Sequence, residues 1–329
     1  MLGEYSLAEV AIFCVIVVAA LLVDLFAHKS DEAISLKNAA IWSVIWVSLG
    51  LGFAAYVGLT HGREQSYLYL AGYLLEKSLS VDNLFVFMAI FSSFSVKDEY
   101  QHRVLYYGII GALILRLIFV AAGASLLALF DKWALTAFGL FVLWSAWKMW
   151  QESQKPDDEI VDYTHHWAVS LAGKVMPVSN RLDGHNFFTK IDNRWHLTPL
   201  FLCLVTVEVA DVMFAFDSVP AIIAITQEPF LVYTSNIFAI LGLRSMYFLL
   251  AAAKRYLCHL EKSVIIILAF IGLKMLVQVF ANIHIKPMYS LAVVIGLLAF
   301  GVIGSIVFPE KPEKPEDSEK PETPEGGTK

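Results

Sequence analysis

The sequence has few cysteines and lacks the features of a cleaved leader. Its three cysteines, Cys14, Cys203 and Cys258, stand apart from one another, and no CxxC pair occurs. This spacing argues against a disulfide framework and against a cysteine-based metal cluster. No Lys or Arg occurs between Met1 and Val10, so the basic region of a secretory signal is missing. We therefore expect the first apolar run to be retained as a helix.

The composition is that of a membrane protein rather than a soluble domain. Hydrophobic residues make up 58% of the chain, and the mean hydropathy is +0.64. Apolar runs of about 18 to 25 residues recur, and each is long enough to cross a bilayer. The net charge of −6 says little about partners, because seven acids lie within the last twenty residues. Nothing in the charge pattern favours nucleic-acid binding.

The apolar runs predict an all-α polytopic membrane protein with about nine transmembrane helices. The connections between them are short except for 151–197, a polar loop that has room for short helices. The predicted spans are 7–27, 38–59, 67–96, 104–130, 133–150, 198–225, 230–253, 263–282 and 288–308.

Basic residues in the connections predict the orientation. Cytoplasmic segments of membrane proteins are enriched in Lys and Arg. With the N-terminus outside, the cytoplasmic segments would hold seventeen of these residues and the outer segments three. We therefore expect an outside N-terminus and a cytoplasmic C-terminus.

The last 21 residues differ in character from the rest of the chain. Residues 1–308 form the predicted transmembrane domain, and residues 309–329 are rich in Pro, Glu and Lys. A segment of this composition cannot bury enough apolar surface to offset its ordering entropy. We expect it to be a disordered cytoplasmic tail.

Charged residues recur in the same order in two sets of three spans. Spans three to five (about 67–150) hold two acids, Arg116 and a Lys-Met pair; spans six to eight (about 198–282) hold acids, Arg244 and a second Lys-Met pair. The six-residue spacing from Glu76 to Asp82 also recurs from Asp211 to Asp217. Because the third and sixth spans run in opposite directions, the pattern predicts an inverted repeat. Transporters with such repeats bind their substrate near the membrane midplane, at the interface of the repeats.

Two predicted spans hold an unusual number of polar residues. Glu76, Asp82 and Asn83 fall in the third span. The sixth span holds Glu208, Asp211, Asp217 and Ser218. Carboxylates at bilayer depth are costly and by default face a cavity, an ion path or a charged partner. A cation site between the two spans would explain them, and Asp24 in the first span is a further candidate.

The helical positions of these residues favour a shared site for some of them. Glu208 and Asp211, three residues apart, lie on one helix face. Asp217 lies about 120° away from Asp211 on a regular helix. Pro220 removes a hydrogen bond to the carbonyl of Phe216, so we expect a break at 216–220 that turns Asp217 inward.

The ligand types predict a hard cation. None of the nine histidines falls within the core of a predicted span, which leaves carboxylate, amide, hydroxyl and carbonyl oxygens. Oxygen ligands suit Mn²⁺, Ca²⁺ or Mg²⁺ better than Zn²⁺ or Cu⁺. The alternative is that the acids neutralise basic residues within the membrane. Arg116 and Arg244 are charge partners in this interpretation. The intramembrane acids nevertheless outnumber the four intramembrane bases, which are Lys77, Arg116, Arg244 and Lys274.

Two long motifs resemble a known family. EKSLSVDNLFVF in the third span and EVADVMFAFDSVPAI followed by SNIFAILGLRSMYFLL resemble the signatures of the TerC family of integral membrane proteins. The likeness covers most of residues 7–307 and is nearest to the Alx-type members. It implies a bacterial inner-membrane protein associated with manganese export and tellurium resistance. The metal ligands that it implies are Glu76, Asp82, Asn83, Glu208, Asp211 and Asp217.

Three functions remain open at this stage. The first is a secondary transporter that exports Mn²⁺, with Ca²⁺ as a competitor and no permanently bound cofactor. ATP-driven transport is not expected, because the chain has no GxxxxGK[ST] motif. The second is a membrane scaffold in the response to metal or tellurium stress, which would not need the acids. The third, an intramembrane aspartate hydrolase, is disfavoured because the acids are too many for one catalytic pair.

Overall fold

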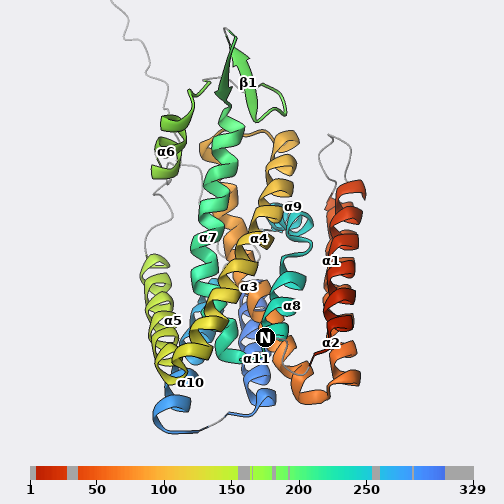
Figure 1. The fold of residues 1–329 in the computed structure, drawn as a ribbon, viewed down its shortest axis with the longest axis vertical. Coiled ribbons are helices and arrows are strands. Elements are labelled where there is room, and N and C mark those ends of the chain that lie inside the picture. The colour runs from red at the N-terminus through yellow and green to blue at the C-terminus, as the bar shows by residue number, and fades with distance from the viewer. Residues whose placement is uncertain are drawn as a thin grey trace, which may run out of the picture.

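The protein is an elongated bundle of helices. A computed structural model describes residues 5–27, 36–154, 164, 166–179, 183–191, 193–253, 260–283 and 285–307. Most helices run along the long axis of the molecule (Figure 1). The predicted disordered tail, 309–329, lies outside the described residues.

The described elements comprise eleven helices and two strands. They are α1 (Leu7–Ala27), α2 (Leu36–Thr60), α3 (Arg63–Ser93), α4 (Asp98–Phe130), α5 (Lys132–Glu152), α6 (Trp167–Val175), β1 (Phe188–Ile191), β2 (Arg194–Leu197), α7 (Pro199–Ile225), α8 (Pro229–Ile240), α9 (Leu243–Ala253), α10 (Leu260–Phe280) and α11 (Pro287–Val307).

The helices have the length and surface of membrane spans. Six of the described helices are long and apolar enough to cross a bilayer, namely α1, α2, α4, α7, α10 and α11, and the pair α8 and α9 makes a seventh if it counts as one span. Large apolar side chains such as Val15, Ile118, Leu140 and Phe300 are exposed on their outer faces, where lipid would cover them. The chain is therefore an all-helical, multi-pass membrane protein. Helices α3 and α5 fall where two further spans were predicted, but they are not among these candidates.

The predicted span 230–253 is not one helix. It is divided into α8 and α9, which meet at an angle of 45°. At the junction Gly242 has a φ of +84°, and a Cβ there would lie 2.5 Å from Cδ1 of Trp46 on α2. A positive φ and close contact with a neighbouring ring both favour glycine. The single-helix prediction was wrong because it took a turn made of apolar residues for continuous helix.

The predicted break near Pro220 does not occur. Helix α7 is continuous from Pro199 to Ile225, with Pro220 inside it. It packs against α3, α4 and α5, and such neighbours allow proline within transmembrane helices. At its N-terminus the Thr198 side chain accepts a hydrogen bond from the backbone N–H of Phe201, which is a common helix cap. Asp217 is therefore placed by regular helical geometry.

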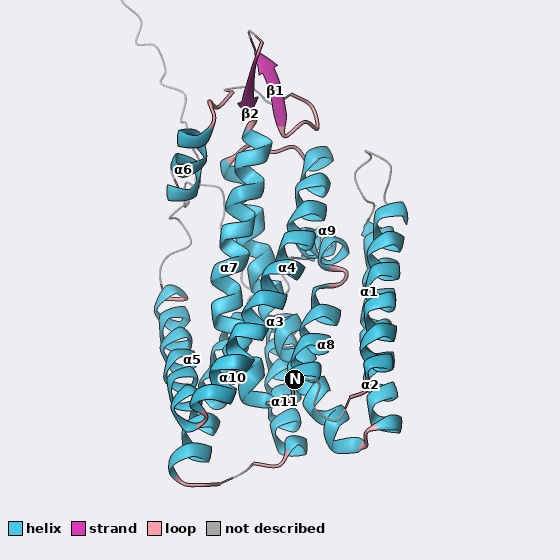
Figure 2. Ribbon diagram, viewed as in Figure 1, coloured by secondary structure: helices cyan, strands magenta, loops and turns pink. Residues whose placement is uncertain are grey.

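The polar loop 151–197 contains a short helix and a hairpin. Helix α6 packs against α7. Strands β1 and β2 pair antiparallel, with Phe188 opposite Leu197 and Ile191 opposite Arg194. The hairpin projects beyond the N-terminal end of α7, and it is the one β element among the described residues (Figure 2). The described part of the fold is thus helical apart from this hairpin.

Helices α3 and α7 contact each other and organise the bundle. Helix α4 packs against α7, α8 packs against α3, and α5 packs against α10. The first core cluster joins α3, α5, α7 and α10 through side chains such as Leu75, Val142, Ile222 and Leu268, all fully buried. This packing brings the polar residues of α3, α4, α7 and α8 together.

Candidate functional site

A buried arginine lies at the junction of four helices. Arg116, in the middle of α4, is 1% exposed and forms an ion pair with Glu76 of α3, which is 0% exposed. Its Nη2 atom also lies 3.6 Å from Oδ1 of Asp211 on α7. Removing one partner from a buried ion pair leaves the other charge uncompensated and costs about 3–5 kcal/mol. These three residues therefore stabilise one another.

Neutral oxygen atoms complete the surroundings of one guanidinium nitrogen. Arg116 Nη1 donates to the Oγ of Ser218 on α7 and to the Oδ1 of Asn236 on α8, each at 3.2 Å. Asn236 also donates from Nδ2 to Oε2 of Glu76, at 3.4 Å. We call Glu76, Arg116, Asp211, Ser218 and Asn236 the central cluster.

The central cluster has unused hydrogen-bonding capacity and an excess of negative charge. Within the described residues, Nε and Nη2 of Arg116 and Oδ2 of Asp211 have no hydrogen-bond partner. Ionised, the two carboxylates and the one guanidinium leave a net charge of −1. Buried groups of this kind are normally satisfied by hydrogen bonds. The cluster therefore has the capacity to accept a further positive charge.

Glu208 lies beside this cluster but does not join it. Its carboxylate packs directly against Gly111 of α4, where a Cβ would collide with it. It is partly buried, and it is close enough to Asp211 for the two carboxylates to repel each other.

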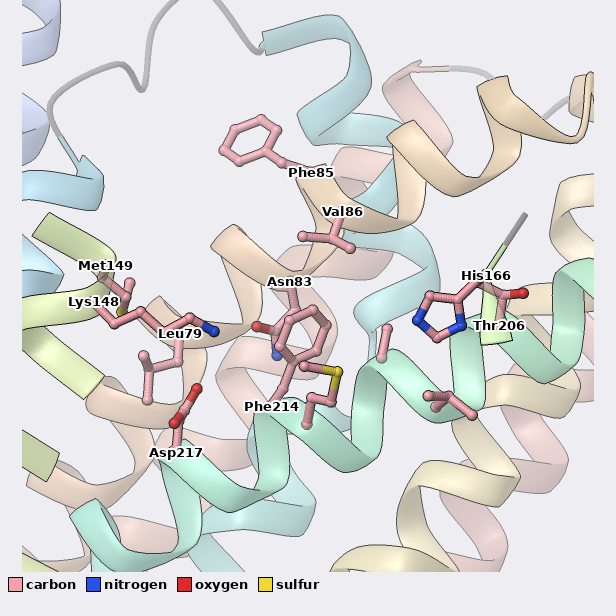
Figure 3. Close-up of a pocket in the computed structure, with 13 residues that line it drawn as sticks. Leu79, Asn83, Phe85, Val86, Lys148, Met149, His166, Thr206, Phe214 and Asp217 are labelled. Atoms are coloured by element: carbon pink, nitrogen blue, oxygen red, sulfur yellow. The ribbon is translucent and has the colours of Figure 1, made fainter. Parts of the chain in front are cut away.

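Asn83 and Asp217 line a separate cavity of about 490 Å³. Asp217 accepts a hydrogen bond from the Oγ of Ser145 on α5, at 2.6 Å. Lys148 points into the same part of the cavity as Asn83 and Asp217, and His166 lines its other side (Figure 3). Asp217 and Ser218 are neighbours on α7, yet one faces this cavity and the other faces Arg116. Helix α7 thus forms the wall between the cavity and the central cluster.

Asp24 and Arg244 form a second ion pair, between α1 and α9. Their side chains lie 3.0 Å apart, and Arg244 also donates to the backbone carbonyl of Asp24. Nη1 of Arg244 lies 3.3 Å from Nδ1 of His102 on α4. Arg116 and Arg244, which were predicted from the sequence to be charge partners, therefore both form ion pairs with acids of the predicted spans.

The predicted metal ligands do not converge on one point in the part of the chain that the structure describes. There, no three Asp, Glu, His or Cys side chains are placed so that they could hold a metal ion. The side chain of Asp82 lies outside that part. Of the remaining predicted ligands, Glu76 and Asp211 meet at Arg116, whereas Asn83 and Asp217 face the cavity.

Comparison with known proteins identifies the family. The family model described as "Integral membrane protein TerC family" matches residues 61–313. This chain belongs to the TerC family. It is 47% identical to the tellurium resistance protein TerC of Serratia marcescens, over 92% of this chain and 94% of the relative. It is 43% identical to the putative membrane-bound redox modulator Alx of Photorhabdus laumondii, over 89% of this chain and 93% of the relative. No solved structure matches the chain.

Three polar contacts of this TerC-family protein were not predicted from its sequence. Asn236, Ser145 and Lys77 all occur in predicted spans. The Nζ of Lys77 donates to the backbone carbonyls of Ala239 and Leu241, at 2.9 and 3.4 Å. These carbonyls lie at the junction of α8 and α9, where helical hydrogen bonding is interrupted. Asn236 falls within the SNIFAILG motif, so a polar residue in an apolar span was the signal that could have identified it.

Proposed function

We propose that this protein is a secondary transporter that exports a divalent metal ion, Mn²⁺ above all, from the cytoplasm. The observation that supports this most is the central cluster, in which two buried carboxylates share one guanidinium. Among the described residues, one carboxylate oxygen of Asp211 accepts no hydrogen bond. Buried acids at bilayer depth mark ion or proton paths by default. If the acids served only to pair with Arg116, one carboxylate would be enough, and the cluster has two.

The cavity beside Asp217 supplies an approach to this cluster in our proposal. Among mostly apolar side chains, its lining has carboxylate, amide, hydroxyl and imidazole groups, which can replace part of the hydration shell of an ion. It also has the ammonium group of Lys148, which an entering cation would have to displace from beside Asp217 (Figure 3). In this proposal Asp217 would bind the ion within the cavity, and Asp211 and Glu76 would bind it on the other side of α7 after the helices around that wall rearrange. Asp82, Asn83 and Glu208 remain proposed ligands along this path, and Asp24 is a further candidate.

The metal preference follows from the donor atoms and from the family resemblance. The cluster offers carboxylate, hydroxyl and amide oxygens, which suit Mn²⁺, Ca²⁺ and Mg²⁺. The choice of Mn²⁺ over the other two rests on the resemblance, and Ca²⁺ is the expected competitor. In this proposal the ion is cargo, and no cofactor is held permanently.

We further propose nine membrane crossings with an inverted repeat of α3–α5 and α7–α10. Two observations support the repeat. The packing of α4 on α7 has a counterpart in the packing of α8 on α3. Where α5 crosses α10, Gly139 and Gly272 approach each other reciprocally: a Cβ on either would lie 3.3 or 3.0 Å from the other's carbonyl oxygen. We also propose that the hairpin end is cytoplasmic and that the membrane is the bacterial inner membrane.

A scaffold in the stress response is the main alternative. The names of two relatives refer to tellurium resistance and to redox modulation, which do not specify transport. A hydrolase is less well supported, because no two of these acids form a catalytic pair. Asp211 faces the central cluster and Asp217 faces the cavity, while Arg116 lies between Asp211 and Glu76. None of these names describes an enzyme.

Metal flux through the purified protein tests the proposal. The protein would be reconstituted into liposomes that contain a Mn²⁺-sensitive dye, with protein-free liposomes as the baseline. We expect saturable Mn²⁺ entry that added Ca²⁺ inhibits. Entry no faster than the baseline, in correctly folded protein, would refute transport and favour the scaffold.

A further inference from the structure

We infer that Arg116 is a tethered counter-ion that occupies the metal position when no metal is bound. This inference rests on the proposed function and specifies how its site works. The described arrangement would be the ion-free state, and a divalent ion would enter by displacing the guanidinium. Arg116 would return as the ion leaves.

The atoms around Arg116 Nη1 carry this inference. Its three partners are a carboxylate oxygen of Glu76, the hydroxyl oxygen of Ser218 and the amide oxygen of Asn236. Hard divalent cations are bound by this set of oxygen donors. One nitrogen of the guanidinium therefore lies where these oxygens converge, as a metal ion would.

The incomplete bonding of the guanidinium indicates that it can be displaced. A guanidinium has five N–H donors, but within the described residues only those on Nη1 make hydrogen bonds in this cluster. Nη2 approaches Asp211 Oδ1 only to 3.6 Å. A purely structural arginine at such a depth is expected to use both nitrogens in a two-pronged pair with a carboxylate.

The charge balance indicates the same exchange. With Arg116 in place, the cluster has a net charge of −1, and the buried Oδ2 of Asp211 has no hydrogen-bond partner in the described part of the chain. A divalent ion in place of the guanidinium would neutralise both carboxylates. The ion and Arg116 cannot both occupy the position between Glu76 and Asp211, so each would promote release of the other.

Thermal unfolding with and without Mn²⁺ tests this inference independently of flux. Arg116→Gln leaves two buried carboxylates without a cation, so we expect it to melt several degrees below wild type in metal-free buffer. Mn²⁺ should restore that loss, and the Mn²⁺-induced rise should exceed the rise in wild type. Arg116→Gln should also slow net Mn²⁺ flux, because the variant has no guanidinium to displace the bound ion.

Two controls separate this exchange from a structural role. Arg244→Gln removes the cation of the other ion pair, and we expect a loss of stability that Mn²⁺ does not restore. The double variant Arg116→Gln/Asp211→Asn has the wild-type net charge of −1 in the cluster. It should recover part of the stability that Arg116→Gln loses, because one buried carboxylate rather than two lacks a cation, but without the Mn²⁺-induced rise.

The outcomes distinguish this inference from the proposed function. If wild type transports Mn²⁺ but the metal does not restore Arg116→Gln, then Arg116 is a structural partner and the inference is wrong. If Arg116→Gln does not fold at all, Arg116→Lys serves instead: it keeps the charge with fewer donors and should show a larger Mn²⁺-induced rise than wild type. An equal or smaller rise would overturn the inference. If wild type shows no Mn²⁺ flux, the proposed function itself fails.

Discussion

Gly242 shows how one residue determines the shape of a span. It combines a φ of +84° with a distance of 2.5 Å from its ideal Cβ to the Trp46 ring. We expect Gly242→Ala to lower the free energy of unfolding by about 1–3 kcal/mol, because it adds backbone strain and overpacking. Thermal unfolding in detergent measures this. Gly52→Ala is the matched control, since nothing lies within 4 Å of its Cβ position, and it should be no less stable than wild type.

The charged members of the central cluster and Ser218 were predicted from the sequence as candidate site residues, and Asn236 was not. Glu76, Asp211 and Arg116 stand out because charge in an apolar span is rare. Asn236 gives a weaker signal, because uncharged polar residues are common where transmembrane helices pack together. Its contribution depends on which residue faces it, and a single sequence does not contain that information.

The position of Asp217 was mispredicted for a specific reason. On a regular helix Ser218, seven residues after Asp211, returns to nearly the same face. The structure has this arrangement, with Asp211 and Ser218 both facing Arg116. Asp217 falls on another face and meets Ser145. The assumption of a break at Pro220 was therefore unnecessary, and regular helical geometry accounts for both sites.

At the scale of the helices, Lys77 supports the bend between α8 and α9. Its ammonium donates to the carbonyls of Ala239 and Leu241, which belong to this interrupted segment. Lys77→Met keeps most of the side-chain volume but removes the donor. We expect a loss of about 1–3 kcal/mol, the usual cost of leaving a buried polar group unsatisfied. Thermal unfolding measures the effect, and a melting temperature equal to that of wild type would contradict this role.

The crossing of α5 and α10 depends on two small residues. Gly139 and Gly272 allow the two backbones to approach closely, as small residues do in membrane helix pairs. We expect Gly139→Val and Gly272→Val each to destabilise the protein by about 1–3 kcal/mol through overpacking. Similar losses in the two variants would agree with a symmetric crossing. A large loss in one and none in the other would count against the repeat.

This crossing also bears on the Lys-Met pairs of the proposed repeat. Lys148-Met149 begins nine residues after Gly139, whereas Lys274-Met275 begins two residues after Gly272. If Gly139 and Gly272 occupy equivalent positions in the two repeats, the two Lys-Met pairs do not occupy equivalent positions. In that case the repeat would rest on the acid spacing and on the helix packing, and the Lys-Met pairs would not belong to it.

At the scale of the whole molecule, apolar run length predicted where the helices lie. The ends of most predicted spans agree with the described helices to within a few residues, because bilayer thickness sets the length of both. The hairpin in 151–197 was not predicted, because its short strands carry no strong alternating pattern. The bend at Gly242 was missed because a turn buried in protein needs no polar residues.

Chemical labelling tests the proposed orientation. Lys190 lies exposed on the hairpin, so Lys190→Cys can be introduced after Cys14, Cys203 and Cys258 are replaced by serine. We expect a membrane-impermeant thiol reagent to label it only after the cells are opened. Labelling in intact cells would show that the hairpin lies outside and reverse the proposed orientation.

Mn²⁺ flux of Asp211→Asn, measured together with its stability, tests the central claim most directly. Asn keeps the shape of the side chain but loses the charge that offsets dehydration of the ion. Glu76 still pairs with Arg116, and the cluster then has no net charge, so no buried charge is left uncompensated. We therefore expect Asp211→Asn to fold and to be more stable than Arg116→Gln, but with flux lowered by about tenfold or more. Glu9→Gln is the control, because Glu9 pairs with His61 away from the central cluster, and its flux should be unchanged. Wild-type flux in stable Asp211→Asn protein would show that the buried carboxylates are not the transport site.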